Sequence, residues 1–227
     1  MSVFSKIVGI SAGFGKLCVP VFLFLIGCGL GETGCQSSRD NRSTTALEDY
    51  VHQILQFRKK RDRVFQTSPN SPIPESLRSR FTGLRYFPIH PDLRFKVRLH
   101  RIVPPDTISM MTSDGRYRPA LRMGYVLFRY RESMLRLNVY RLQGTSGAGG
   151  HYFVPFLDAT SGKTTYGGGR YLYLQPDTLD WYILDFNLAY NPSCAYGQKR
   201  FVCPLPPAEN TLPVPILAGE MRWEPPP

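Results

Sequence analysis

Residues 124 to 142 read GYVLFRYRESMLRLNVYRL, and this stretch decides the class of fold. After Glu132-Ser133, apolar side chains alternate with polar or basic ones from Leu135 to Val139, and an apolar and aromatic run lies before the pair at 125–128. This period of two is typical of strands that bury one face. The stretch therefore predicts a β-hairpin made of residues 124–131 and 135–142, and the apolar face of its second strand consists of Leu135, Leu137 and Val139.

The same period recurs outside the hairpin. Residues 95–100 (FKVRLH) alternate apolar and basic side chains, and strand-like runs follow at 152–157, 164–174 and 181–186. Ser/Gly or Pro/Asp turns separate these runs, with no convincing crossover helix between them. Successive strands with short connections favour an antiparallel sheet, so we expect a mainly β fold, either a partly closed barrel or a sandwich. The Pro-rich end, residues 204–227, is expected to be extended coil packed on the sheet.

One helix is predicted before the sheet, within a single domain of residues 44–227. Thr45 and Glu48 have the spacing of a capping box, and Pro69 lies beyond the predicted end, so the helix should run from about Thr45 to Phe65. The charged run at 58–61 (RKKR) is interpreted as a solvated face first and as a contact with lipid head groups second. The apolar residues that recur at three- and four-residue intervals are Leu47, Tyr50, Val51, Ile54 and Phe57.

The first residues have the layout of an export signal. Residues 1–16 carry Lys6 and Lys16 without an acidic residue, and residues 17–26 form an apolar run. A run of about ten residues is short for a membrane-spanning helix, which needs about 20, so a permanent transmembrane helix is the weaker alternative. We therefore expect residues 1–27 to be a signal peptide that is removed.

The end of that segment predicts a lipid anchor. Leu25-Ile26-Gly27-Cys28 resembles the bacterial lipobox, in which small residues precede a cysteine that receives diacylglycerol. Cys35 is a poorer candidate, because Glu32 occupies the position where the lipobox has Leu. Residues 28–43 are small and polar, as suits a flexible tether. The chain is thus expected in the cell envelope, attached to a membrane by lipid on Cys28 and facing outside the cytoplasm.

Positive charge is concentrated in one part of the chain. Residues 58–141 contain 19 Lys and Arg against six Asp and Glu, whereas residues 28–57 and 142–227 each have a net charge of −2. If the strands pair as expected, one basic surface should contain Lys96, Arg98, Arg129, Arg131 and Arg136. Such a surface on a tethered protein fits anionic head groups, and a merely solvated surface is the other interpretation. Nucleic acid is not expected as a partner, because the chain is predicted to be exported.

Motifs of familiar enzymes are absent or misplaced. Gly9-Ile10-Ser11-Ala12-Gly13 has the G-x-S-x-G pattern of hydrolases, but it lies in the predicted signal peptide and not at a strand-to-helix turn. Phosphate-loop, dinucleotide-binding and zincin motifs do not occur. The four histidines have no ligand spacing, so no metal site and no cofactor are expected.

The C-terminal third contains several dense motifs. They are FVPF at 153–156, TYGGGRY at 165–171, and a long run from DFN at 185–187 to AGE at 218–220. In these residues the chain closely resembles the bacterial and archaeal family known as domain of unknown function 1684, and the likeness extends upstream towards Arg58. His90 stands where the family pattern has Asp, and Met221 where a Lys usually follows AGE. The resemblance implies a shared fold and supplies no activity.

Polar residues in these motifs are the candidates for a site. Three glycines precede Arg170 and permit a bulge or a close backbone approach. Arg170 is expected to pair with Asp185 or Glu220, or to bind an anion. The structural alternative is that the polar groups only fasten Pro-rich loops to the sheet. The candidate binding residues are Arg170, Asp185, Asn187, Tyr190, Asn191, Tyr196, Glu209, Asn210 and Glu220.

Cys194 and Cys203 enclose eight residues. In an exported protein they are expected to form a disulfide, which would contribute about 2.5 to 3 kcal/mol in the chain-entropy model. A reactive thiol is the alternative.

The sequence therefore predicts a binding or scaffolding module whose ligand it does not identify. An envelope enzyme of hydrolase type is the rival prediction. It requires one pocket that contains Arg170, Asp185, Tyr190, Cys194, Glu209 and Glu220.

Overall fold

The computed structural model describes residues 37–143 and 152–226. The predicted signal peptide, Cys28 and the tether up to residue 36 lie outside the described residues, so they remain predictions. The helices are α1 (Ser37–Thr67) and α2 (Glu75–Arg78). The strands are β1 (Arg94–Met111), β2 (Tyr117–Tyr130), β3 (Ser133–Leu142), β4 (Phe153–Phe156), β5 (Arg170–Tyr173), β6 (Gln175–Thr178) and β7 (Trp181–Asp185). Short 3-10 turns lie at Pro91–Leu93, Phe186–Leu188, Ser193–Tyr196 and Ala208–Asn210.

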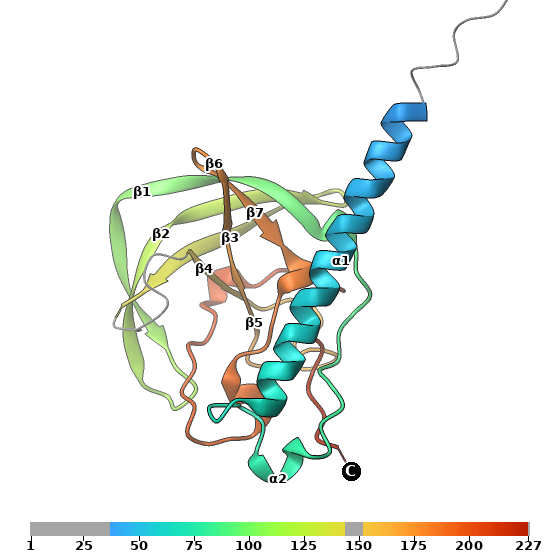
Figure 1. Ribbon diagram of the computed structural model, residues 1–227. Coiled ribbons are helices and arrows are strands. Elements are labelled where there is room, and N and C mark those ends of the chain that lie inside the picture. Colours follow the sequence, from blue (N-terminus) through green and yellow to red (C-terminus); the bar gives the residue numbers. More distant parts are fainter. Residues whose placement is uncertain (1–36, 144–151, 227) are drawn as a thin grey trace, which may run out of the picture. The chain divides into compact units, whose positions relative to one another are not determined.

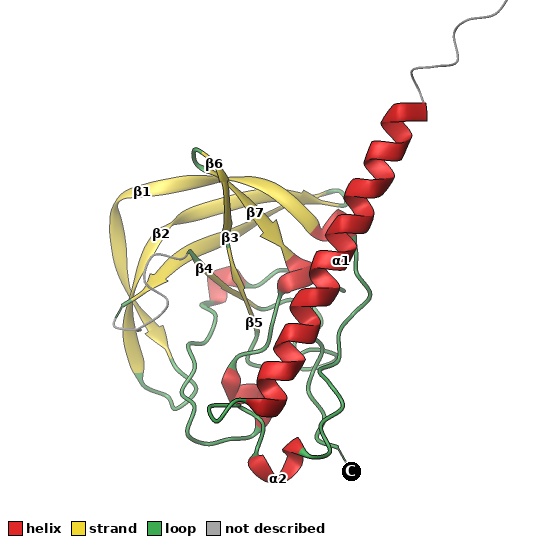
Figure 2. Cartoon of the chain, viewed as in Figure 1, coloured by secondary structure: helices red, strands yellow, loops and turns green. Residues whose placement is uncertain are grey.

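The strands form one sheet in the order β5-β4-β3-β2-β1-β7-β6, and each neighbouring pair is antiparallel. The sheet curls into an open half-barrel (Figure 1). Figure 2 shows how much of the remaining chain is loop, drawn in green. The expected mainly β, antiparallel and partly closed architecture is thus confirmed, and the sandwich alternative is wrong because the strands of residues 37–143 and 152–226 form a single sheet.

The hairpin of β2 and β3 follows the alternation in the sequence. Tyr130 pairs with Ser133, so the turn is made by Arg131 and Glu132, one residue earlier than expected. The faces are unchanged by this shift. Leu135 and Leu137 are buried, and Arg136 between them is exposed.

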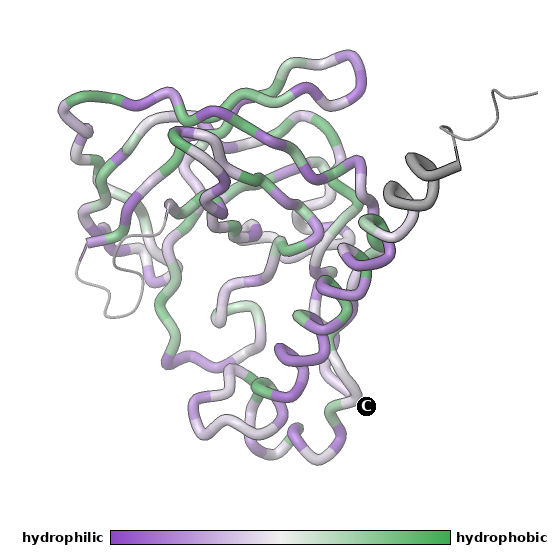
Figure 3. The backbone as a smooth tube through the Cα atoms, turned by 45° about the horizontal axis from the view of Figure 1, so that its top comes forward, coloured by the Kyte–Doolittle hydropathy of each residue, from purple (hydrophilic) through white to green (hydrophobic). Residues whose placement is uncertain are grey.

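The concave face of the sheet carries the main hydrophobic core. It is closed by residues of the 3-10 turns and of the Pro-rich end, including Phe186, Leu212 and Ile216. Along the strands in Figure 3, hydrophobic and hydrophilic segments alternate, as expected for a sheet with one buried face. The strand residues of this core include Val97, Leu99, Val126, Phe128, Leu135, Leu137, Val139, Val154, Phe156, Leu172 and Leu184.

A break in register divides the two longest strands. The pairing of β1 with β2 shifts between Arg101 and Asp106, and the pairing of β2 with β3 shifts between Arg122 and Gly124. Gly124 has φ +153°, and a Cβ there would lie 2.1 Å from the carbonyl oxygen of His100. Only glycine permits this approach of two backbones. Beyond the break a second core cluster contains Met110, Ala120, Tyr140, Phe153 and Tyr171.

Two strand predictions differ from the structure. The strand expected at 164–174 is confined to β5, because residues 158–165 form tight turns with hydrogen bonds of their own. Strand β6 was not predicted, since all four of its residues are exposed and one is Pro176. The Pro-rich end is extended, as expected. It is bound to the sheet, for example through Leu205 N–H, which donates to Met111 O at 2.7 Å.

Helix α1 is longer than expected. It begins at Ser37, inside the stretch expected to be a flexible tether, and ends at Thr67. Residues 37–67 contain no Gly or Pro, so a helix nucleated further along can extend to residue 37 at little cost. Of the expected apolar face, Ile54 is buried whereas Leu47 is exposed. Neither of the two α-helices in the described part of the chain has the length and apolar character needed to cross a membrane.

Candidate functional site

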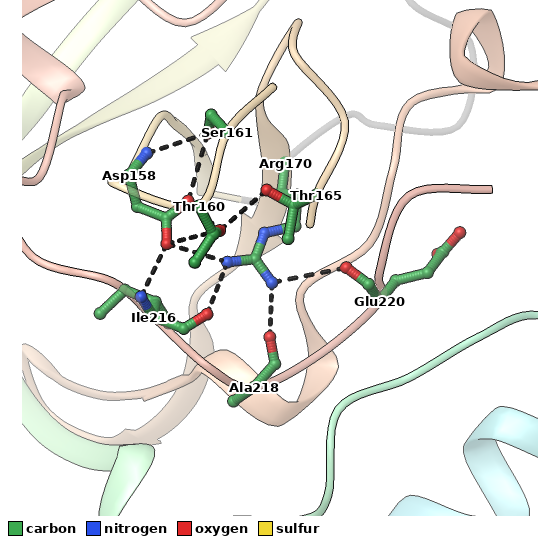
Figure 4. A network of polar contacts seen from close by, with 8 residues as sticks. All are labelled: Asp158, Thr160, Ser161, Thr165, Arg170, Ile216, Ala218 and Glu220. Atoms are coloured by element: carbon green, nitrogen blue, oxygen red, sulfur yellow. Dashed lines mark hydrogen bonds and ion pairs between the residues drawn. The ribbon is translucent and has the colours of Figure 1, made fainter. Parts of the chain in front are cut away.

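Arg170, the first residue of β5, is fully buried. It donates from Nη2 to Asp158 Oδ2 at 3.3 Å and to Ile216 O at 2.9 Å, and from Nη1 to Ala218 O. Burial lowers the pKa of Arg170, and the Asp158 carboxylate opposes that shift. Asp158 is held in turn by Thr160 Oγ1 at 2.7 Å and by the Ile216 N–H at 2.7 Å (Figure 4).

This Arg170 network corrects the expected pairing. Arg170 pairs with Asp158, and neither Asp185 nor the Glu220 side chain is its partner. Figure 4 shows the Glu220 side chain directed away from the Arg170 guanidinium. Of Glu220, only the backbone carbonyl oxygen faces the guanidinium, 3.5 Å from Arg170 Nη1. The glycine before Arg170 explains the tight packing, because a Cβ on Gly169 would lie 2.7 Å from Phe156 O. With Asp158 and two carbonyls in place, the guanidinium has little capacity left for an anion.

Glu220 lies at the centre of a second network. Its carboxylate is fully buried and accepts from Arg61 Nη2 at 3.0 Å, from Asn191 Nδ2 at 2.9 Å and from the Tyr196 hydroxyl. Burial raises the pKa of Glu220, while Arg61 and the hydrogen bonds from Tyr196 and Asn191 oppose that shift. The Arg61 guanidinium also lies 4.9 Å from the centre of the Tyr190 ring.

The charged run at 58–61 is therefore only partly solvated, contrary to expectation. Lys59 and Lys60 are exposed, but Arg61 pairs with buried Glu220 and Arg58 donates to Phe87 O at 3.0 Å. Helical spacing explains the split, since residues 58 and 61 share a face that the two lysines do not. This face attaches α1 to the rest of the domain.

Asp185, the last residue of β7, forms a third network with the same helix. It accepts from the Tyr50 hydroxyl at 3.0 Å and from Asn187 N–H at 2.9 Å. Asn187 also accepts from His90 N–H and donates to His90 O, both at 2.8 Å. Burial raises the pKa of Asp185, and the bonds from Asn187 and Tyr50 oppose that shift.

Glu209 and Asn210 lie elsewhere, in the last 3-10 turn. Asn210 is buried and joins two strands, since it accepts from Asn138 N–H at 2.9 Å and donates to Pro155 O at 2.8 Å. Glu209 is exposed beside a groove of about 300 Å³ that is also lined by Met111 and Tyr140. Burial, with a contribution from Glu209, raises the pKa of Tyr140 to about 12.

The candidate residues thus do not share one pocket. Arg170, Asp185 and Glu220 belong to separate networks, and Cys194 is joined to Cys203 in a disulfide. Two grooves in the described residues, one lined by Arg80 and Trp223 and the other by Met111 and Glu209, each contain at most one of the six residues that the enzyme prediction required. Among residues 37–143 and 152–226, no three His, Cys, Asp or Glu side chains are grouped to hold a metal ion.

Four of the five expected basic residues do share one face of the sheet. Lys96 and Arg98 on β1, Arg129 on β2 and Arg136 on β3 alternate with buried residues and are exposed. The fifth, Arg131, lies in the turn with φ +54°. We call the outer side of β3, β2, β1 and β7 the basic face.

Three cations of the basic face, Arg98, Arg129 and Arg136, have no acidic partner within 4 Å in the described part of the chain. Lys96 pairs with Asp177 at 2.6 Å, and the Arg136 guanidinium lies 4.0 Å from the centre of the Tyr125 ring. The sequence identified these basic residues, and the structure adds the exposed apolar side chains between them. Those side chains are Leu127, Met134 and Trp181.

Comparisons with known proteins agree with this fold. A solution NMR structure of an uncharacterised protein from Haloarcula marismortui superposes with a TM-score of 0.60 and is 37% identical in sequence. The match covers 78% of this chain and 96% of that chain. A search of curated proteins found no match. Residues 79–221 match the family described as "Protein of unknown function (DUF1684)", and the chain belongs to this family.

Proposed function

We propose that this protein is a lipid-anchored component of the cell envelope whose domain binds anionic lipid head groups through the basic face. The observation that supports the proposal most strongly is the presence of four exposed cations on one side of the sheet, of which Arg98, Arg129 and Arg136 lack acidic partners in the described residues. Near an anionic surface each such cation contributes about 1 kcal/mol.

The two attachments complement each other physically. A single acyl chain gives weak, reversible membrane binding, whereas the diacylglyceryl group predicted at Cys28 has two chains and would by itself hold the protein at a membrane. The basic face would then orient the held domain against anionic head groups. A basic face on a protein held at a membrane has anionic lipid within reach at high local concentration.

The rival enzyme hypothesis has less support. It depended on one pocket shared by Arg170, Asp185 and Glu220, and these side chains are instead engaged with separate partners. Structural roles account for their burial and their hydrogen bonds. A binding module that uses its surface remains the better proposal.

Vesicle binding tests the head-group proposal. The chain from residue 37 onward is suitable, because residues from Arg42 form one compact unit with its own core, and the similar Haloarcula protein is folded in solution. It should sediment with vesicles of phosphatidylglycerol and phosphatidylcholine at low salt and not with phosphatidylcholine alone. Salt should abolish binding, since exposed charges are screened within about 8 Å at physiological ionic strength.

The variant Arg98→Gln, Arg129→Gln, Arg136→Gln should weaken binding about 100-fold, because three cations at about 1 kcal/mol each are lost. A matched control removes three exposed cations of α1 with Lys59→Gln, Lys60→Gln and Arg63→Gln. Equal weakening by both triple variants, or no binding at low salt, would contradict the proposal.

The lipid anchor is tested in cells. The full chain should fractionate with membranes, and mass spectrometry should find a diacylglyceryl group on an N-terminal Cys28. Cys28→Ser should release the protein or leave it unprocessed. A soluble wild-type protein that retains residues 1–27 would refute the anchor and leave the vesicle result unaffected.

A further inference from the structure

The hairpin of β6 and β7 ends in an exposed apolar tip. Leu179 in its turn is 95% exposed, and Trp181 at the start of β7 is 40% exposed. Single exposed apolar residues are common on soluble proteins and need no explanation. The residues around this tip, however, have charges and contacts that suit a membrane surface.

The two acidic groups nearest the tip of the hairpin, Asp177 and Asp180, are each paired with a cation of β1. The Asp180 carboxylate accepts from Arg101 Nε at 2.8 Å, and Lys96 Nζ lies 2.6 Å from Asp177 Oδ2. Unpaired carboxylates would be repelled by an anionic surface, and these pairs reduce that repulsion. The tip can therefore approach negative charge while Leu179 remains its most exposed large apolar side chain.

The tip is also held in place. Leu99 N–H donates to Asp180 O at 3.0 Å, and Arg101, while bound to Asp180, donates from Nη1 to the Tyr152 hydroxyl at 2.7 Å. Thr178 pairs with Trp181 across a two-residue turn. Because the hairpin is already ordered, presenting Leu179 to a partner costs little conformational entropy.

The tip continues the basic face. Trp181 is the cross-strand partner of Arg98, and the Lys96 ammonium lies 5.7 Å from the centre of the Trp181 ring. Figure 1 shows β6 and β7 at the end of the sheet next to β1. The interface between head groups and acyl chains favours three kinds of group, namely tryptophan, cations and exposed aliphatic side chains. All three occur together at this tip.

We infer that the β6–β7 hairpin inserts Leu179 and Trp181 into the head-group and acyl-chain boundary of an anionic bilayer, while Lys96 and Arg101 hold the carboxylates of Asp177 and Asp180 near the tip. This inference rests on the proposed head-group binding and adds a depth and an orientation to it. The cations provide attraction, and the hairpin provides apolar burial that salt does not screen.

Tryptophan fluorescence tests the insertion. The chain has two tryptophans, so Trp223→Phe leaves Trp181 as the sole reporter. Trp223 packs against Tyr196 at 5.7 Å, and phenylalanine keeps an aromatic ring there. In this variant, the chain from residue 37 should show a blue shift on binding phosphatidylglycerol vesicles and should be quenched by lipids brominated on their acyl chains.

Leu179→Ser in the same background should lower vesicle affinity about tenfold, because burial of a leucine side chain is lost. Leu55→Ser is the matched control, since Leu55 is 51% exposed on α1 and is not part of the β6–β7 hairpin. Circular dichroism should show both variants to be folded.

The outcomes separate this inference from the proposed function. One outcome is salt-sensitive vesicle binding in which Trp181 is not quenched and Leu179→Ser has the same vesicle affinity as Leu55→Ser. This outcome would overturn the insertion and leave head-group binding intact. Quenching with a selective loss for Leu179→Ser would support both. Absence of binding to anionic vesicles by every form would overturn both.

Discussion

At the scale of single residues, the buried polar side chains are mostly satisfied by one another and by the backbone. In Arg170, Nη1 and Nη2 join Asp158 to the carbonyls of Ile216 and Ala218, and only Nε has no hydrogen-bond partner among the described residues. Arg170 links the turn that precedes β5 to the C-terminal segment. A buried and hydrogen-bonded group of this kind fixes the path of the loops and is not positioned to react with a ligand.

Replacing Arg170 by Met should lower the free energy of unfolding by about 3 to 5 kcal/mol. The substitution leaves Asp158 buried without a cation and leaves backbone carbonyls unpaired. Urea unfolding followed by circular dichroism measures the change. Arg98→Met is the control and should change stability by less than about 0.5 kcal/mol, because Arg98 is exposed. A loss below about 1 kcal/mol for Arg170→Met would contradict this account of the network.

The sequence indicated that these residues would be hydrogen-bonded but not with which partners. Asp158, Asp185 and Glu220 are all acidic and all lie in the C-terminal third, so composition cannot select among them. The choice depends on how residues 158–165 turn back towards β5. Similarly, the attachment of Arg61 to Glu220 joins residues 159 positions apart, and no local pattern signals it.

At the scale of elements, the curl of the sheet depends on the shift in register within β1 and β2. Gly124 lies at this shift, with the His100 carbonyl 2.1 Å from the position that a Cβ would take. Strand breaks of this kind bend a sheet and increase its twist. The half-barrel therefore needs a residue without a side chain at this position.

Gly124→Ala should destabilise the domain by about 3 kcal/mol or more, because overpacking against a backbone adds to the cost of a positive φ. Gly115→Ala is a matched control. Gly115 also has a positive φ of +79°, but nothing lies within 4 Å of the position that a Cβ would take there, so only about 1 to 2 kcal/mol should be lost. Thermal or urea unfolding compares the two. Equal losses would show that backbone contact at Gly124 is unimportant.

Elements were predictable where their pattern is local. The β2–β3 hairpin is recognisable because apolar and polar residues alternate from Leu135 to Val139 and an apolar run lies on the other side of Glu132-Ser133. Strand β6 could not be recognised, since Gln175 to Thr178 have no buried face and β6 exists only by pairing with β7. The start of α1 was misplaced because the capping-box spacing at Thr45 and Glu48 occurs inside a longer helix.

At the scale of the whole molecule, the described domain divides its charged residues by role. Arg58, Arg61 and Arg170 are inward-facing and structural, whereas Arg98 and Arg129 are exposed and without acidic partners in the described residues. The excess positive charge of residues 58–141 thus includes a fraction that is free to act on a partner. Its position on one face, together with the predicted anchor at Cys28, is the basis of the proposed membrane role.

Depth measurement by site-directed spin labelling tests that role most directly. The chain from residue 37 contains only the two cysteines of the disulfide, so a label at Met134→Cys on the basic face or at Gln53→Cys on α1 is unique. With phosphatidylglycerol vesicles, the label at 134 should become shielded from a water-soluble nickel chelate and more accessible to oxygen, and the label at 53 should not change. Shielding at 53 with none at 134, in protein that is bound to the vesicles, would contradict the account.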